Sequence, residues 1–149
     1  MNDPKEIEII LVEDNDVDAE LTLRALQKYH LSNKILRMED GQELIDYLFQ
    51  PDGCPKEGVN NCPKLILLDL KLPRVSGLEV LRMLKNDQFT KQIPVVVLTS
   101  STEDRDIDEC YRLGVNSYIV KPVEFDQFME SVQELGLYWL LLNKYASKS

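Results

Sequence analysis

The sequence predicts an α/β protein in which a doubly wound sheet of five parallel strands is flanked by five helices. Two observations support this fold class. Short apolar runs alternate five times with segments of helical periodicity, an order typical of parallel sheets covered by helices. Several runs are apolar at almost every position, which indicates strands buried on both faces. The chain of 149 residues suits one domain with a sizeable core.

The five strands are expected where these apolar runs occur. The first, third and fourth runs lead into polar groups, namely Glu13-Asp14, Asp69 and Thr99. Because the carboxyl ends of parallel strands meet at one edge of the sheet, these groups should lie together where ligands usually bind. The predicted strands are Ile7–Val12, Lys34–Met38, Leu65–Asp69, Val95–Thr99 and Ser117–Val120.

Helices are expected between the strands, and several of their ends carry capping signals. Asp40 with Glu43 and Ser76 with Glu79 have the spacing of a capping box. Gly114 can adopt the left-handed conformation that ends the fourth helix. The helices are predicted near Asp16–Lys28, Gly41–Phe49, Gly77–Lys85 and Glu103–Leu113, with a fifth that starts near Glu124.

The segment Gln50–Pro63 is rich in proline, glycine and asparagine, which predicts a surface loop. The chain has three cysteines, Cys54, Cys62 and Cys110, an odd number without zinc-ligand spacing. This usage favours a reduced, cytoplasmic protein. Cys54 and Cys62 share the loop, so a disulfide or metal site between them stays open. The single histidine, His30, is expected at the surface and supplies no catalytic triad.

Charge and hydropathy exclude two classes of partner. The net charge of −9 disfavours direct binding of nucleic acid, which requires a basic surface. No apolar stretch approaches the roughly 18 residues that a membrane-spanning helix needs. We therefore expect neither nucleic acid contact nor membrane insertion.

The acidic side chains at the predicted sheet edge are the strongest candidates for function. Glu13, Asp14 and Asp69 would repel one another unless a cation neutralised them, and such oxygen ligands suit Mg²⁺. An aspartate carboxylate can also attack phosphorus, while Lys121 at the end of the fifth strand would neutralise oxygen charge. The alternative is structural, because Asp14 or Asp16 could simply cap the first helix.

These residues resemble the response-regulator receiver domains of two-component signalling, which have the CheY-like fold. The family has an acidic pair after strand one, an aspartate after strand three, Ser or Thr after strand four and Lys-Pro after strand five. The resemblance spans nearly the whole chain and implies the flavodoxin-like strand order 2-1-3-4-5. The sequence fills these places with Glu13-Asp14, Asp69, Thr99 and Lys121-Pro122.

The resemblance implies a role for each of these residues. Asp69 would be the phosphoacceptor, and Mg²⁺ or Mn²⁺ would be bound by Asp14, Asp69 and the backbone carbonyl of Lys71, with Glu13 acting through water. Lys121 would pair with the carboxylate and then with the phosphoryl group. The Lys121–Pro122 bond would be cis, which only a bond to proline adopts at low cost. The family's switch residues correspond to Thr99 and Tyr118.

The last helix carries an apolar stripe at helical spacing, which predicts packing on the sheet. Beyond Gly136 the chain becomes apolar nearly all round, a pattern that marks interfaces. We therefore expect an extended C-terminal helix and a homodimer through the fourth helix, fifth strand and fifth helix. The interface residues would be Tyr138, Trp139, Leu141 and Tyr145.

Finer features resemble the regulators paired with bacterial phytochromes, notably in cyanobacteria. They are the long loop Gln50–Pro63, the stretch Ile93–Thr99 and an aromatic-Trp-Leu segment in the last helix. This resemblance implies a single receiver domain over residues 1–149 without an output domain, and a histidine kinase partner of the phytochrome type. Lys71 is a departure, because it places a cation two residues after Asp69.

The sequence fits two other classes of function less well. A pseudo-receiver would bind partners regardless of phosphate, but the complete set of site residues speaks against it. A phosphatase of the haloacid-dehalogenase type needs a second aspartate two residues after the nucleophile, where this chain has Lys71. Neither a G-x-x-x-x-G-K-[ST] nor a G-x-G-x-x-G motif occurs, which disfavours nucleotide enzymes. A signalling switch that catalyses only its own phosphorylation and dephosphorylation is therefore expected, rather than an enzyme.

Overall fold

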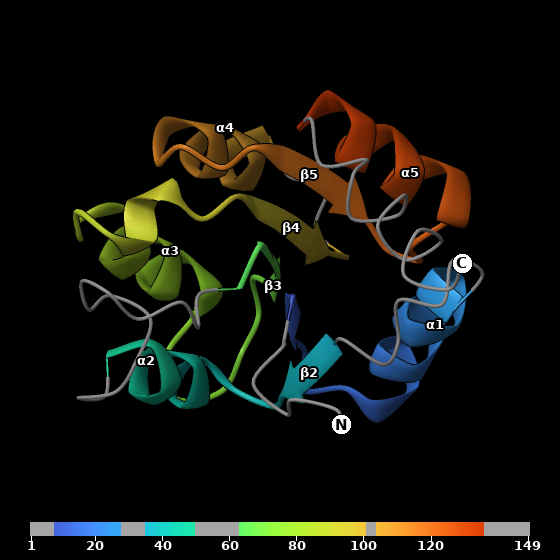
Figure 1. The fold of residues 1–149 in the computed structure, drawn as a ribbon, viewed down its shortest axis with the longest axis horizontal. Coiled ribbons are helices and arrows are strands. Elements are labelled where there is room, and N and C mark those ends of the chain that lie inside the picture. The colour runs from blue at the N-terminus through green and yellow to red at the C-terminus, as the bar shows by residue number, and fades with distance from the viewer. Residues whose placement is uncertain (1–7, 28–34, 50–62, 101–103, 136–149) are drawn as a thin grey trace, which may run out of the picture.

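Five parallel strands form a single sheet in the computed structural model, which describes residues 8–27, 35–49, 63–100 and 104–135. One α-helix follows each of the five strands along the chain (Figure 1). The elements are β1 Ile9–Val12, α1 Asp16–Gln27, β2 Ile35–Met38, α2 Gly41–Phe49, β3 Leu65–Asp69, α3 Gly77–Lys85, the short 3₁₀ helix η2 Thr90–Gln92, β4 Val95–Thr99, α4 Asp104–Arg112, β5 Ser117–Val120 and α5 Phe125–Glu134.

The strand order is β2-β1-β3-β4-β5, and every neighbouring pair is parallel. This order confirms the predicted fold class. β1 pairs with β2 on one side and with β3 on the other, with Val12 opposite both Met38 and Leu68. The chain therefore leaves β1 and β3 in opposite directions across the sheet. Such a reversal opens a crevice at the carboxyl ends of the two strands, where ligands bind in open α/β sheets.

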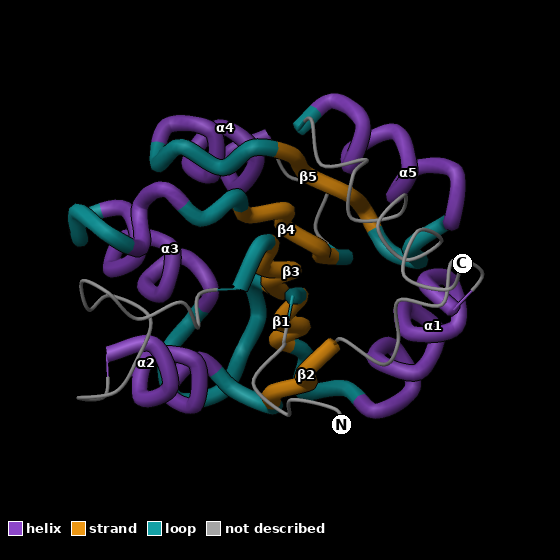
Figure 2. The backbone as a smooth tube through the Cα atoms, viewed as in Figure 1, coloured by secondary structure: helices purple, strands orange, loops and turns teal. Residues whose placement is uncertain are grey.

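The helices cover both faces of the sheet, with α1 and α5 on one face and α2, α3 and α4 on the other (Figure 2). Alternate residues of each strand serve different cores. In β1, Ile10 and Val12 pack toward α2 and α3, whereas Ile9 and Leu11 pack toward α1 and α5. All four are fully buried. This two-sided burial explains why β1 is apolar throughout and why β3 and β4 are apolar up to their last residues.

Most element boundaries agree with the sequence patterns. The predicted ranges of β3, β4, β5, α2 and α3 are confirmed residue for residue, while β1 starts at Ile9 rather than Ile7. The helix η2 was not predicted, because three residues are too short to show periodicity. Its start is fixed by the Asp87 carboxylate, whose Oδ2 accepts from the backbone amides of Phe89 (3.0 Å) and Thr90 (2.9 Å).

The capping predictions also hold. Ser76 Oγ accepts a hydrogen bond from the Glu79 amide at 3.2 Å, and Asp40 Oδ1 accepts from the Glu43 amide at 2.9 Å. Each bond satisfies an amide that the first helical turn leaves without a partner. Gly114 follows α4 with φ of 95°, the left-handed conformation that glycine adopts most easily.

Some sequence predictions concern residues outside the described ranges. They include nearly all of the loop Gln50–Pro63 with Cys54 and Cys62, as well as His30 and the proposed interface residues Tyr138, Trp139, Leu141 and Tyr145. Within the described part of the chain, no helix combines the length and the apolar character that crossing a bilayer requires.

Candidate functional site

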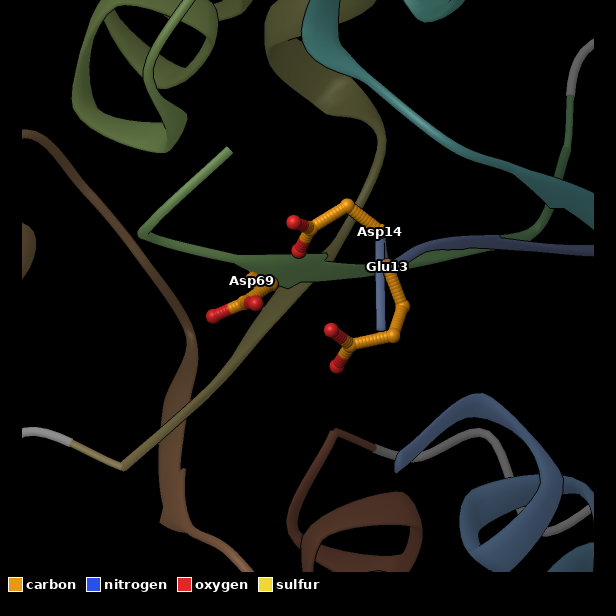
Figure 3. Close-up of side chains that lie close together, drawn as sticks. All are labelled: Glu13, Asp14 and Asp69. Atoms are coloured by element: carbon orange, nitrogen blue, oxygen red, sulfur yellow. The ribbon is translucent and has the colours of Figure 1, made fainter. Parts of the chain in front are cut away.

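Three carboxylates meet at the carboxyl ends of β1 and β3. Glu13 and Asp14 follow β1 directly, and Asp69 is the last residue of β3. One oxygen from each carboxylate lies within 4.8 Å of the other two, and Figure 3 shows the three groups gathered around one region. Glu13 and Asp69 are buried, whereas Asp14 is exposed. The three carboxylates of the predicted acidic site therefore come together at the carboxyl ends of β1 and β3, where the chain reverses direction across the sheet.

Glu13 is the most deeply buried of the three carboxylates. Its Oε1 accepts from Lys121 Nζ at 2.7 Å, and its Oε2 accepts from the Asn15 amide at 3.2 Å. Burial raises the pKa of the Glu13 carboxyl to about 7; the hydrogen bond from Lys121 opposes this rise and the charge of Asp69 adds to it. Crowded negative charge is thus a real cost at this site.

Lys121, one residue after β5, is the cation that faces this charge. Its Nζ lies 2.7 Å from Glu13 Oε1, 2.9 Å from Asp18 Oδ2 and 3.3 Å from Asp69 Oδ2. Burial would lower the pKa of Lys121, but the hydrogen bonds to Asp18 and Glu13 and the charge of Asp69 raise it above its ordinary value. The ammonium group therefore stays charged. One lysine against several carboxylates leaves the site with an excess of negative charge.

The donor set fits a hard divalent cation. The cluster of Glu13, Asp14 and Asp69 offers carboxylate oxygens alone, and Mg²⁺ and Mn²⁺ prefer oxygen ligands. Exposure of Asp14 leaves one side open to water, which suits Mg²⁺ because this ion keeps several of its waters. The backbone amide of Lys71 points at the same group, donating to Asp69 Oδ1 at 3.4 Å.

Of the two predicted switch residues, Thr99 is joined to Lys121 through its backbone, and Tyr118 lies in the neighbouring strand β5. Thr99 ends β4 and is fully buried, and its carbonyl accepts from the Lys121 amide at 2.8 Å. Tyr118 in β5 is half-buried and packs against the core beneath α2, α3 and α4. The Lys121–Pro122 bond is cis, as the resemblance implies. Lys121 thus contacts both the acidic cluster, through its side chain, and the end of β4, through its backbone.

Two residues missed by the sequence analysis also hold the site together. Arg37 in β2 donates to the Glu13 carbonyl from Nε (3.0 Å) and from Nη2 (2.8 Å), and its Nη1 lies 2.9 Å from Asp16 Oδ1. Asp18 in the first turn of α1 binds Lys121. A charged residue next to the carboxyl end of a strand was the available signal for Arg37. For Asp18, the available signal was a carboxylate in the first turn of the helix that follows Glu13-Asp14.

The cap of α1 differs from both sequence candidates. Asn15 Oδ1 accepts from the Asp18 amide at 2.9 Å, so Asn15 is the residue whose side chain caps the helix. Neither Asp14 nor Asp16 takes this role, because Asp16 is already the first helical residue and pairs with Arg37. Asp14 is therefore left free for another function, which removes the main structural explanation for its presence.

The loop between β3 and α3 is held close to the site by two features. A Cβ on Gly77 would lie 2.3 Å from the Asp69 carbonyl oxygen, so only glycine fits there. Arg74, at φ of 65°, binds the Asp40 carboxylate through Nε and Nη2, each at 3.1 Å. This ion pair connects the loop after Asp69 to the residue that precedes α2.

Comparison with known proteins agrees with this geometry. Residues 9–133 match the family model of the response regulator receiver domain. The chain is 41% identical over 136 residues to the probable methanogenesis regulatory protein FilR2 of Methanothrix harundinacea, a match that covers 91% of this chain and 85% of that protein. It is 35% identical over 142 residues to the response regulator Rcp1 of Synechocystis sp., covering 93% of this chain and 91% of that protein.

Solved structures give the same picture. The bacteriophytochrome response regulator AtBRR is 47% identical and superposes with a TM-score of 0.74, over 91% of this chain and 96% of that chain. The Mn²⁺-bound form of Rcp1 is 34% identical with a TM-score of 0.68, over 90% of this chain and 94% of that chain. The predicted resemblance, including its phytochrome-associated branch, is confirmed by these matches.

Proposed function

Because this chain belongs to the response regulator receiver family, we propose that it is a signalling switch in which Asp69 accepts a phosphoryl group from a histidine kinase. The observation that carries the assignment is the cluster of Glu13, Asp14 and Asp69 with Lys121 bound across it. A phosphate-independent binding module is not favoured. Burying several ionised side chains together lowers stability, and binding a partner without phosphate would not require them.

The proposed reaction is a single transfer of a phosphoryl group from histidine to Asp69. An Asp69 carboxylate oxygen attacks the phosphorus of a phosphohistidine; a P–O bond forms, the P–N bond breaks, and the imidazole nitrogen leaves and takes up a proton. Catalysis of such a step is mainly positioning and neutralisation of oxygen charge. Lys121 Nζ, 3.3 Å from Asp69 Oδ2, supplies one positive charge. The same residues would catalyse dephosphorylation, in which water attacks the phosphorus, the P–O bond to Asp69 breaks, and inorganic phosphate leaves the regenerated carboxylate.

Mg²⁺ or Mn²⁺ is the proposed cofactor. The residues that would hold it are Asp14 and Asp69 directly, the Lys71 carbonyl, and Glu13 through water. A bound divalent cation would neutralise phosphoryl oxygens as charge builds on them. The oxygen-only cluster supports this proposal, as does the Mn²⁺-bound form of the homologous Rcp1.

Phosphotransfer profiling tests the function. The purified protein is mixed with each autophosphorylated histidine kinase of its source organism, and label transfer is followed over short times. We expect rapid transfer from one kinase in the presence of Mg²⁺ and its loss when EDTA is added. If neither a kinase nor a small phosphodonor such as acetyl phosphate labels the protein in the presence of Mg²⁺, the proposed function is wrong.

A phytochrome is the kinase that we propose to test first. AtBRR, a bacteriophytochrome response regulator, is 47% identical to this chain over nearly its whole length. FilR2 is also similar at 41% identity and is named for methanogenesis, so profiling must include kinases of other sensory types. The expected cytoplasmic location would place the receiver where a kinase domain can reach it.

Thr99 and Tyr118 are proposed to report the state of Asp69. A hydrogen bond from Thr99 Oγ1 to a charged phosphoryl oxygen is worth roughly 1.5–3 kcal/mol, enough to shift a conformational equilibrium at least tenfold. We expect Thr99→Ala to be phosphorylated normally but to lose the accompanying change at Tyr118. NMR signals of the Tyr118 ring, compared at equal phosphorylation, measure this. An identical change in both proteins would remove Thr99 from the switch.

A homodimer through α4, β5 and α5 is proposed for the assembled protein. The support is the apolar sequence around Tyr138, Trp139, Leu141 and Tyr145, together with the exposure of Tyr111 on α4 in the described part. Aromatic residues of this kind are frequent anchors of interfaces. Sedimentation velocity at micromolar concentration should show a dimer. A monomer both with and without acetyl phosphate would exclude it.

A further inference from the structure

Lys121 is already fully engaged before any phosphoryl group arrives. Its ammonium group has three N–H donors, and three carboxylates accept from it: Glu13 at 2.7 Å, Asp18 at 2.9 Å and Asp69 at 3.3 Å. The phosphoacceptor is thus the most distant of its partners. The lysine side chain is only 12% exposed, so water does not easily replace a carboxylate that is taken away.

We propose that Asp18 is a positioning residue that holds Lys121 back from Asp69 in the unphosphorylated protein and therefore competes with the phosphoryl group for it. The inference rests on the proposed function, because it concerns the affinity of a group bonded to Asp69. Asp18 is fixed for this role by its place in the first turn of α1, where its amide binds Asn15 Oδ1.

The burial of the three carboxylates decides which partner Lys121 gives up. A phosphoryl group on Asp69 carries more negative charge than the carboxylate and requires a closer ammonium donor. Glu13 is 1% exposed, so water cannot replace the hydrogen bond that it would lose if Lys121 moved away from it. Asp18 is 36% exposed, so water can take over its hydrogen bonds. Lys121 therefore exchanges Asp18, rather than Glu13, for the phosphoryl group.

Binding of beryllofluoride, which bonds to a carboxylate oxygen in place of a phosphoryl group, tests the inference at equilibrium. The full-length wild type and the variants Asp18→Ala, Asp18→Asn and Asp18→Glu are titrated at saturating Mg²⁺, with the bound fluorine signal followed by ¹⁹F NMR. We expect Asp18→Ala to bind roughly fivefold more tightly, in line with release of a partly exposed ion pair. Asp18→Asn should gain less, because its amide oxygen still accepts from Lys121. Asp18→Glu should restore wild-type affinity.

Glu124→Gln is the matched control. Glu124 is exposed and lies three residues after Lys121, so this variant removes one negative charge nearby, and Glu124 is not among the carboxylates that accept from Lys121 in the structure. Its affinity should stay within about twofold of wild type. Equal affinity in wild type and Asp18→Ala, weaker binding in Asp18→Ala, or an equal gain in Glu124→Gln would overturn the inference. Failure of the wild type itself to bind would instead overturn the role of Asp69.

Discussion

An Asp69→Asn variant will take up no phosphoryl group above background from the kinase or the small phosphodonor that labels the wild type. The amide that replaces the carboxylate is not a nucleophile toward phosphorus, and the substitution introduces no other nucleophile. The variant should remain folded, because asparagine has nearly the same shape and removes one of the like charges that crowd Glu13. Label incorporation and urea unfolding of the same samples separate loss of chemistry from loss of fold.

Asp14→Asn is the control for this experiment. Asp14 belongs to the same cluster and is exposed, so it is the alternative carboxylate that a phosphodonor could reach. We expect Asp14→Asn to be labelled to the wild-type level when Mg²⁺ is raised, since a neutral amide oxygen is a weaker metal ligand. Label retained in Asp69→Asn and lost in Asp14→Asn at all Mg²⁺ concentrations would transfer the phosphoacceptor role to Asp14.

Lys121→Met should destabilise the protein by about 3 kcal/mol near pH 8 in EDTA, because it leaves the buried carboxylates of Glu13 and Asp69 without their counter-charge. The loss should shrink near pH 5. The Glu13 carboxyl already has its pKa raised from 4.5 to about 7 in the folded protein, and losing Lys121 raises it further. Stability from a raised carboxyl pKa is present at low pH and disappears as the pH rises through the folded value.

Urea unfolding at pH 5 and pH 8 measures this effect, and Lys71→Met is its matched control. Lys71 lies two residues after Asp69, but its side chain is exposed, so its loss should change stability by less than about 0.5 kcal/mol. Mg²⁺ should stabilise Lys121→Met more than the wild type, because the cation supplies the missing charge. An equal loss at both pH values, or an equal loss in Lys71→Met, would contradict the proposed charge balance.

The fold could be predicted from the sequence because buried segments have apolar side chains in a recognisable pattern. Strands with both faces covered, such as Leu65–Asp69 and Val95–Thr99, are apolar at every inner position. Helix starts were signalled by Ser76 and Asp40, whose side chains do bind backbone amides. The short helix η2 has no such pattern, since its only determinants are local bonds to the Asp87 carboxylate.

The centre of the site could also be predicted, but its supporting residues could not. Asp69 is conspicuous because a carboxylate at the end of a buried strand requires a partner. The contacts of Asp18 with Lys121 and of Arg37 with the Glu13 carbonyl depend on side-chain length and direction across the crevice. A pattern along one chain does not contain these directions. The structural alternative for the cap, Asp14 or Asp16, was wrong for a similar reason, because the sequence does not show which neighbouring side chain reaches the first-turn amides, and the structure has Asn15 there.

The division of each strand between two cores has a consequence for how such a protein can diversify. The carboxylates that bind Lys121 belong to the residue after β1, to β3 and to α1, whereas Tyr118 packs beneath α2, α3 and α4. Substitutions beneath α4 therefore need not disturb the ammonium–carboxylate network. After gene duplication, one copy could acquire a new binding partner through α4 and still be phosphorylated by the original kinase. The two faces of the sheet thus allow target recognition to change independently of recognition of the phosphoryl donor.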